Sequence, residues 1–106
     1  MLGYMENEIL CIFSTFPTKE SAETVADTLV SEGLAACVQV GSPTTSFYIW
    51  EGVKCKSAEY PVAIKVSKKN IDRLRKRFFE LHEYDCPEWV VLTAETSDGY
   101  FKFVDR

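Results

Sequence analysis

Apolar residues recur along the chain with two different spacings, and the alternation between these spacings predicts the order of the elements. A near-continuous apolar run at residues 9–15 has the length of a strand and predicts the first one. Apolar residues at helical spacing follow, between a capping residue at Thr18 and Gly33, so a helix is expected to end near Gly33. Residues 34–50 again have an extended pattern, with a bend expected at residues 41–43, where Gly and Pro interrupt strand pairing.

Residues 34–66 are the most distinctive stretch, because aromatic and β-branched residues flank a turn at residues 51–52, as in a β-hairpin. A fully extended arm over residues 34–50 would span roughly 55 Å at ~3.3 Å per residue. A domain of this size has a radius of gyration of only about 13 Å, so the arm must bend or project. A projecting arm would expose Tyr48 and Trp50 to water, and a second copy of the chain is the natural cover.

The second half of the chain predicts a strand, a helix, another strand and a short final helix. Apolar residues at every second position of residues 59–66 predict a third strand with one apolar face. A second helix is expected from Ser67 onward. Its inner stripe consists of Ile71, Leu74, Phe78 and Leu81. Residues 88–94 predict a fourth strand, and Ser97 or Asp98 is expected to cap the final helix.

The order β-α-β-β-α-β predicts an α+β fold of the ferredoxin-like class, in which two helices cover one face of a four-stranded antiparallel sheet. The long hairpin between the second and third strands and the short C-terminal helix are additions to this arrangement. The strands at residues 9–15 and 88–94 are apolar on both faces, which is typical of strands that are buried on both faces. Because the two helices leave one face uncovered, we expect a homo-oligomer.

Composition narrows the class of protein. The 106 residues suffice for one domain, residues 1–106, and the net charge of -4 argues against nucleic acid and anionic membranes as partners. No apolar run approaches the ~20 residues that cross a bilayer. Residues 1–8 are expected to be irregular and lack a basic stretch before an apolar run, which favours the cytoplasm. The four cysteines form no C-x-x-C motif and are expected to be free thiols there.

No motif in the sequence points to catalysis, since the one histidine has no nucleophile beside it and the five glycines form no phosphate-binding loop. We therefore expect no enzyme. His82 has two interpretations: a helix-terminal imidazole that bonds nearby carbonyls, or a ligand to a divalent transition metal together with a thiolate and a carboxylate. Cys37 also has two interpretations, since it could supply that thiolate or be a small buried apolar residue. Tyr48 and Trp50 are favoured as interface residues over ligand-stacking groups.

Four stretches together resemble the CutA divalent-cation tolerance family over nearly the whole chain. They are residues 34–38 (LAACV), 46–52 (SFYIWEG) and 59–65 (EYPVAIK), and the spaced set His82, Tyr84, Pro87 and Glu88. The resemblance implies a ferredoxin-like protomer in a tight homotrimer, binding of copper or another divalent ion, a role in tolerance of such ions, and no enzymatic activity. It also implies a metal site formed by Cys37, His82 and Glu88.

A second function stays open beside the first: a signalling trimer like the PII proteins, which share this architecture by resemblance. Such a trimer would bind an anionic small molecule between subunits with the help of Lys65.

The expected subunit-interface residues are Tyr48, Trp50 and Trp89. One departure from the family pattern bears on the site, because Glu83 stands where Pro is usual, and its carboxylate is expected to favour the charged form of His82.

Overall fold

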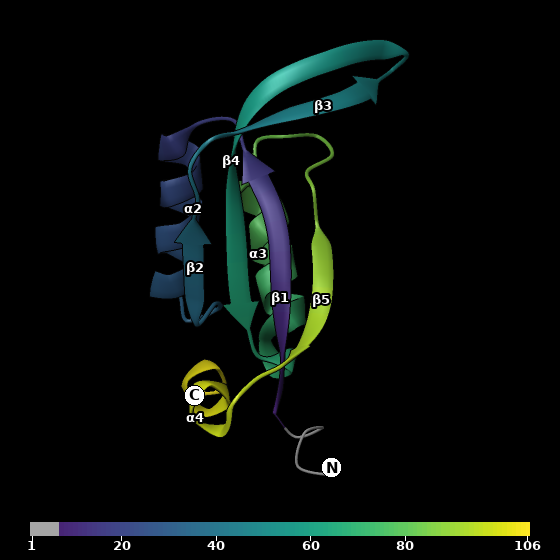
Figure 1. Cartoon of the computed structure of the whole chain (residues 1–106). Coiled ribbons are helices and arrows are strands. Elements are labelled where there is room, and N and C mark those ends of the chain that lie inside the picture. The colour runs from purple at the N-terminus through teal and green to yellow at the C-terminus, as the bar shows by residue number, and fades with distance from the viewer. Residues whose placement is uncertain (1–6) are drawn as a thin grey trace.

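The computed structural model describes residues 7–106, in which five strands and three α-helices follow one another along the chain (Figure 1). Of the irregular start expected at residues 1–8, residues 1–6 lie outside this range. The strands are β1 (Glu8–Phe16), β2 (Cys37–Val40), β3 (Thr44–Trp50), β4 (Val53–Val66) and β5 (Val90–Glu95). The helices are α2 (Lys19–Ser31), α3 (Ile71–Leu81) and α4 (Asp98–Val104), with a 3₁₀ turn, η1 (Lys68–Asn70), before α3.

The strands form an antiparallel sheet in the order β2-β4-β1-β5, and β3 pairs with the far end of β4. β4 pairs with two strands along this edge: its residues 62–65 pair with β2, and its residues 53–59 pair with β3. Helices α2 and α3 lie behind the sheet, whereas the β3–β4 hairpin projects sideways beyond it (Figure 1). The hairpin makes the chain elongated, with extents of 48 × 29 × 24 Å. The predicted α+β class with an antiparallel sheet is confirmed.

Local sequence explains where several elements begin and end. Thr18 caps α2, since its hydroxyl accepts a hydrogen bond from the backbone amide of Ser21 at 3.0 Å. Gly33 follows the helix with a φ of +74°, a conformation that glycine adopts without strain. At the hairpin tip, Glu51 and Gly52 have φ values of +50° and +82°, which gives a two-residue turn that suits the twist of paired strands.

The second predicted strand, residues 34–50, is divided in the structure. The backbone amides of Leu34 and Ala35 donate to the carbonyl of Leu29, so these residues close the end of α2 and do not begin a strand. The expected bend at residues 41–43 separates β2 from β3. Hydrophobic pattern alone did not distinguish a buried helix end from a buried strand, because both are continuous apolar runs.

The second helix and the last strand begin later than predicted. Ser67 precedes the 3₁₀ turn η1, and the α-helix itself begins at Ile71. β5 begins at Val90. Trp89, just before it, packs onto the core, and its ring centroid lies 5.0 Å from that of Phe78. Trp89 was expected at a subunit interface, and within one chain it already covers the end of the core.

The core lies between the sheet and helices α2 and α3. Its buried residues are Leu10, Ile12 and Phe16 from β1, Ala22, Val25 and Leu29 from α2, Val62, Ile64 and Val66 from β4, and Leu74 and Phe78 from α3. The predicted inner stripe of the second helix and the predicted apolar face of the third strand are confirmed by this arrangement.

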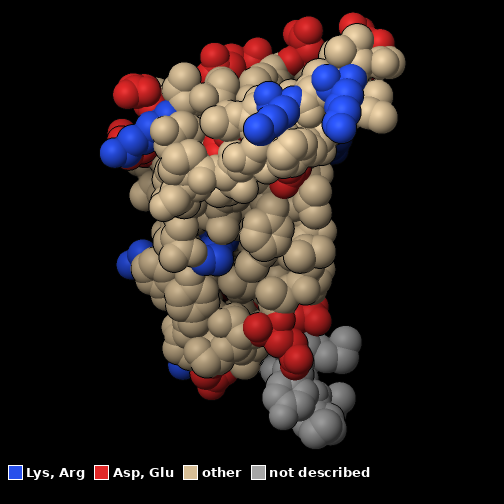
Figure 2. Space-filling view, turned by 45° about the horizontal axis from the view of Figure 1, so that its top comes forward, with Lys and Arg blue, Asp and Glu red and all other residues tan. Residues whose placement is uncertain are grey.

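Neither α2 nor α3 covers the other face of the sheet, which we call the open face. Its residues are Cys11, Phe13, Cys37, Gln39, Ala63, Lys65, Val90 and Leu92. Phe13, Val90 and Leu92 are 40%, 45% and 51% exposed, respectively. Figure 2 shows a broad band with few charged side chains across the middle of the molecule, with acidic groups gathered toward its ends. One chain therefore leaves a large apolar surface in water.

Candidate functional site

A cleft of about 620 Å³ lies between the β3–β4 hairpin, the end of β1 and the loop that joins α3 to β5. This loop passes beneath the projecting hairpin (Figure 1). The lining residues are Thr15, Pro17, Ser46, Phe47, Tyr48, Trp50, Cys55, Ser57, Ala58, Glu59, Tyr84, Asp85, Cys86 and Glu88. Among the residues that the structure describes, three carboxylates line the cleft and no Lys or Arg does. The cleft is therefore suited to a cation and not to an anion.

The hairpin supplies one wall of the cleft from alternate positions of its two strands. Tyr48 on β3 stands opposite Cys55 on β4, and the Tyr48 hydroxyl lies 3.2 Å from that of Ser57. Because side chains alternate along a strand, Cys55, Ser57 and Glu59 lie on the same face of β4. Tyr48 and Trp50, which the sequence favoured as interface residues, thus line the cleft in one chain.

Glu59 is the one buried carboxylate among residues 7–106, with 9% of its surface exposed. Its Oε2 accepts a hydrogen bond from the Thr15 hydroxyl at 3.0 Å and another from the Tyr84 hydroxyl at 3.0 Å. These two bonds join the base of the hairpin to the end of β1 and to the loop after α3. Sequence reasoning missed this residue, and its signal was a glutamate just before the alternating apolar residues 60–66 of β4.

Tyr84 donates its phenol proton to that carboxylate. Burial, the hydrogen bond to Glu59 and the negative charge of Glu59 together raise the pKa of Tyr84 far above its ordinary value. The phenol therefore stays protonated throughout the range in which proteins fold, and it remains a hydrogen-bond donor to Glu59.

His82 lies beneath the cleft, with both ring nitrogens engaged by the backbone. Its Nδ1 accepts a hydrogen bond from the amide of Tyr84 at 3.1 Å, so Nε2 carries the proton and donates to the carbonyl of Thr15 at 2.8 Å. The ring also stacks on Phe16, with centroids 4.2 Å apart. Of its two interpretations, the structure favours the imidazole that bonds nearby carbonyls, because neither nitrogen has a lone pair free for a metal.

Glu83 does favour the charged form of His82, as expected, but it does not decide the protonation state of the ring. Burial lowers the pKa of His82, and this effect outweighs the Thr15 carbonyl and the charges of Glu83 and Glu59, which act in the opposite direction. Glu83 is exposed, so water screens its carboxylate, whereas His82 itself is buried. The folded protein therefore holds His82 in its neutral form.

Cys37 and Lys65 lie on the open face, away from the cleft. They are directly opposite each other in the pairing of β2 with β4, and the Lys65 ammonium donates to the side-chain carbonyl of Gln39. Thr15, which contacts His82, pairs with Pro61, and Pro61 is four positions along β4 from Lys65. That offset corresponds to about 13 Å. One chain therefore does not bring Cys37 to His82.

Glu88 is the member of the predicted ligand set that lines the cleft. Within residues 7–106, no three side chains of His, Cys, Asp or Glu are close enough to hold a metal ion together. Within one chain, the donor set Cys37, His82 and Glu88 is therefore not brought together.

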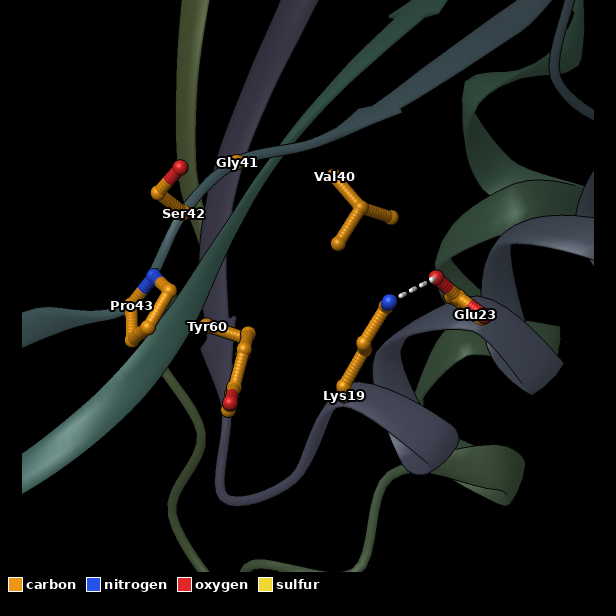
Figure 3. Close-up of a pocket in the computed structure, with 7 residues that line it drawn as sticks. All are labelled: Lys19, Glu23, Val40, Gly41, Ser42, Pro43 and Tyr60. Carbon is orange, nitrogen blue, oxygen red and sulfur yellow. Dashed lines mark ion pairs between the residues drawn. The ribbon is translucent and has the colours of Figure 1, made fainter.

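A second hollow of about 420 Å³ lies between the N-terminal turn of α2 and the bend that separates β2 from β3 (Figure 3). Its two charged residues, Lys19 and Glu23, point toward each other and lie 3.9 Å apart (Figure 3). Because these exposed charges neutralise each other, the hollow offers little to a charged ligand. The cleft under the hairpin is the stronger candidate for a binding site.

The family model described as "CutA1 divalent ion tolerance protein" matches residues 10–106. The chain belongs to this family. Among curated relatives, the divalent-cation tolerance protein CutA of Thermus thermophilus is 37% identical over 94 residues, which are 89% of each chain. The corresponding protein of Pyrococcus horikoshii is 32% identical and covers 91% of this chain and 94% of its own. The rice protein "Protein CutA 1, chloroplastic" is 36% identical, but this chain spans only 53% of its length.

Solved structures of the family have the same fold. The divalent cation tolerance protein from Thermus thermophilus superposes with a TM-score of 0.84 at 35% identity, over 92% of this chain and 94% of that one. A PII-like protein CutA from Nostoc sp. PCC 7120, in its apo form, superposes with a TM-score of 0.83 at 37% identity, over 90% and 92%. No helix within residues 7–106 is long and apolar enough to cross a bilayer.

Proposed function

We propose that this protein is a homotrimer with a ferredoxin-like protomer, that it binds a divalent metal ion, first of all Cu²⁺, and that it acts in tolerance of such ions. Its curated relatives are named as tolerance proteins and not as enzymes, and we propose no catalytic activity. We also propose a cytoplasmic location, although relatives in rice and Archaeoglobus fulgidus are called chloroplastic and periplasmic.

The uncovered open face is the single observation that carries this proposal. Phe13, Val90 and Leu92 form part of a continuous apolar surface, and monomers rarely expose such patches. Cyclic contact with further copies would bury it, together with the exposed apolar residues of the hairpin. A cation site shared between copies would also explain why one chain does not gather its ligands.

Sedimentation equilibrium at micromolar concentration tests the assembly. We expect a particle of about three times the 12.1 kDa chain mass. The variant Leu92→Lys places a charge on the open face and should shift the population toward the monomer. The matched control is Val30→Lys, which changes a residue of similar exposure on α2, away from the open face, and should leave the mass unchanged. A wild-type chain that sediments as a monomer would refute the proposal.

Calorimetric titration of the assembled protein with Cu²⁺ tests the metal site. If Cys37 and Glu88 are ligands, Cys37→Ser and Glu88→Gln each weaken binding by about tenfold or more, as loss of one ligand usually does. Cys11→Ser is the matched control, because Cys11 lies in the same row of the open face as Cys37, across β4. The variant His82→Gln asks whether the imidazole leaves its backbone partners to bind metal. If Cu²⁺ affinity were unchanged in Cys37→Ser, Glu88→Gln and His82→Gln, the assignment of these residues as ligands would be refuted.

The alternative is a PII-like signalling trimer that binds an anionic small molecule between subunits. A PII-like name belongs to the Nostoc structure described above, and Lys65 on the open face is the available cation. A thermal-shift comparison of nucleotides with metal ions separates the two functions, since a specific ligand raises the melting temperature.

A further inference from the structure

The outer side of helix α3 concentrates positive charge in an otherwise acidic chain, and we infer that it binds a short acidic segment of a partner protein. Residues 68–81 contain six of the twelve Lys and Arg residues of the sequence but two of its sixteen Asp and Glu residues, which gives this segment a net charge of +4. The rest of the chain has six cations and fourteen acidic residues, a net charge of -8. Such binding would be separate from the proposed binding of metal ions and does not rest on it.

Half of the cations in this segment are already paired with carboxylates of the same chain. The paired ones are Lys68, Lys69 and Arg77. The other three, Arg73, Arg75 and Lys76, are exposed and form no ion pair with a carboxylate of residues 7–106. Arg73 donates a hydrogen bond to the side-chain carbonyl of Asn70, which is neutral. The positive charge of these three side chains therefore remains available to a partner.

Helix α3 lies on the side of the sheet opposite the open face. Together with α2 it forms a layer behind the sheet (Figure 1). Leu74 and Phe78 of α3 are buried in the core, so the exposed cations lie on the outer side of the helix. Copies that associate through the open face would leave this outer side in water. A partner would therefore reach it in the assembled protein.

The length of the basic segment favours a short acidic partner. Residues 68–81 extend over about 20 Å, which about six residues of an extended peptide would span. Carboxylates of such a peptide would form charge-assisted hydrogen bonds with the guanidinium groups. Duplex DNA or an anionic membrane would extend beyond the segment onto the acidic remainder of the chain, which would repel it.

An exposed aromatic ring lies beside two of the unpaired cations. Phe79 follows Arg75 by four positions and Lys76 by three, and these spacings place side chains on the same side of a helix. Phe79 is 43% exposed, and its ring centroid lies 5.5 Å from that of Trp89. An apolar side chain within the acidic segment would pack on this ring. The partner that fits is therefore acidic with an apolar residue among its carboxylates.

Fluorescence anisotropy of a labelled peptide titrated with the wild-type protein tests the inference. The probe is a peptide of about eight residues, Glu and Asp around one Leu, and the matched neutral probe has Gln and Asn in their place. At roughly 20 mM salt we expect a Kd of about 0.1 mM or lower, at least about tenfold tighter than the neutral peptide, and weaker binding at roughly 0.15 M salt. Absence of binding, or equal affinity for both peptides, would overturn the inference. Tighter binding of a DNA duplex or of phosphatidylserine vesicles than of the acidic peptide would also overturn it.

Two double variants locate the binding. Arg75→Gln with Lys76→Gln removes two unpaired cations from α3 and should weaken binding of the acidic peptide by about fivefold or more. Lys19→Gln with Lys102→Gln removes two exposed cations from α2 and α4, and it should change the affinity by less than about twofold. Both double variants change the net charge equally, and exposed Gln suits a helix. Equal affinity in wild type and the α3 variant, or an equal loss in both double variants, would overturn the assignment to α3. The Cu²⁺ titration above has a separate readout, so either proposal can fail without the other.

Discussion

The carboxylate of Glu59 and the phenol of Tyr84 meet at 3.0 Å, across a gap of 25 positions in the sequence. This hydrogen bond ties the projecting β4 strand to the loop between α3 and β5. Thr15 donates to the same carboxylate oxygen, so three separate segments converge on one atom. The position of the hairpin relative to the sheet therefore depends on polar contacts as well as on strand pairing.

Loss of the phenol hydroxyl should destabilise the fold. In Tyr84→Phe, the buried carboxylate of Glu59 keeps Thr15 as its one described donor. A hydrogen bond to a charged group contributes about 2 kcal/mol, and we expect a loss of that order in the free energy of unfolding. Urea denaturation at fixed protein concentration measures it, since association of copies would otherwise shift the transition.

Tyr100→Phe is the matched control for this change, because the described contacts of Tyr100 are made by its ring and its backbone. It should alter the urea midpoint little. If Tyr84→Phe were as stable as this control, the contact between Tyr84 and Glu59 would contribute nothing to stability.

Stability should fall as the pH drops through the range in which histidine titrates. Burial lowers the pKa of His82 in the folded protein, whereas the unfolded chain has the ordinary value of about 6.5. Below that pH the unfolded chain binds a proton that the folded protein resists, so acid favours unfolding; above it, the full stability is present. His82 is the one histidine of the sequence, which makes the assignment direct.

Melting curves between about pH 5.5 and pH 7.5 measure this dependence in the wild type and in His82→Gln. The variant loses two backbone hydrogen bonds and should melt at a lower temperature at every pH. Its melting temperature should, however, depend less on pH than that of the wild type. An equally steep pH dependence in both proteins would assign the effect to carboxylates and not to His82.

Much of the fold was predictable from the sequence because its signals are local. The alternation at residues 59–66 gave the buried face of β4, and Thr18 and Gly33 marked the ends of α2. The turn at residues 51–52 was visible as well, since glycine tolerates the positive φ that a two-residue hairpin requires. Each of these features depends on residues that are neighbours in the chain.

The candidate site was much less predictable, because its residues meet only in the folded chain. Glu59 lies in a stretch that the sequence marked, yet its partners are 44 and 25 positions away. Cys37 shows the same limit from the other side: its residue type suggested a metal ligand, and the pairing of β2 with β4 places it on the open face, apart from His82 within one chain. Residue type gives the chemistry that a side chain can do, and strand register decides which other groups it meets.

Two glycines should respond to alanine with opposite signs. A Cβ added to Gly41 would lie 3.1 Å from the ring Cγ of Pro61, which is closer than an ordinary van der Waals contact. We expect Gly41→Ala to cost about 1 kcal/mol through overpacking at the bend. Gly99 lies in α4 with nothing within 4 Å of an added Cβ, so Gly99→Ala should stabilise the helix by about 0.5–1 kcal/mol. Urea midpoints that move in the same direction for both variants would contradict this interpretation of the bend.

Adjacent residues on β1 should also differ in sign, because their hydroxyls face opposite sides of the sheet. Ser14 is 1% exposed, and its hydroxyl has no hydrogen-bond partner within the described chain. Since an unsatisfied buried hydroxyl costs free energy, Ser14→Ala should stabilise the protein by about 1 kcal/mol. Thr15 donates its hydroxyl to Glu59, so the near-isosteric Thr15→Val should destabilise it by about 1–2 kcal/mol. Urea unfolding of the two variants, measured side by side, tests this difference in sign. If Ser14→Ala lost as much stability as Thr15→Val, the Ser14 hydroxyl would have a hydrogen-bond partner in solution.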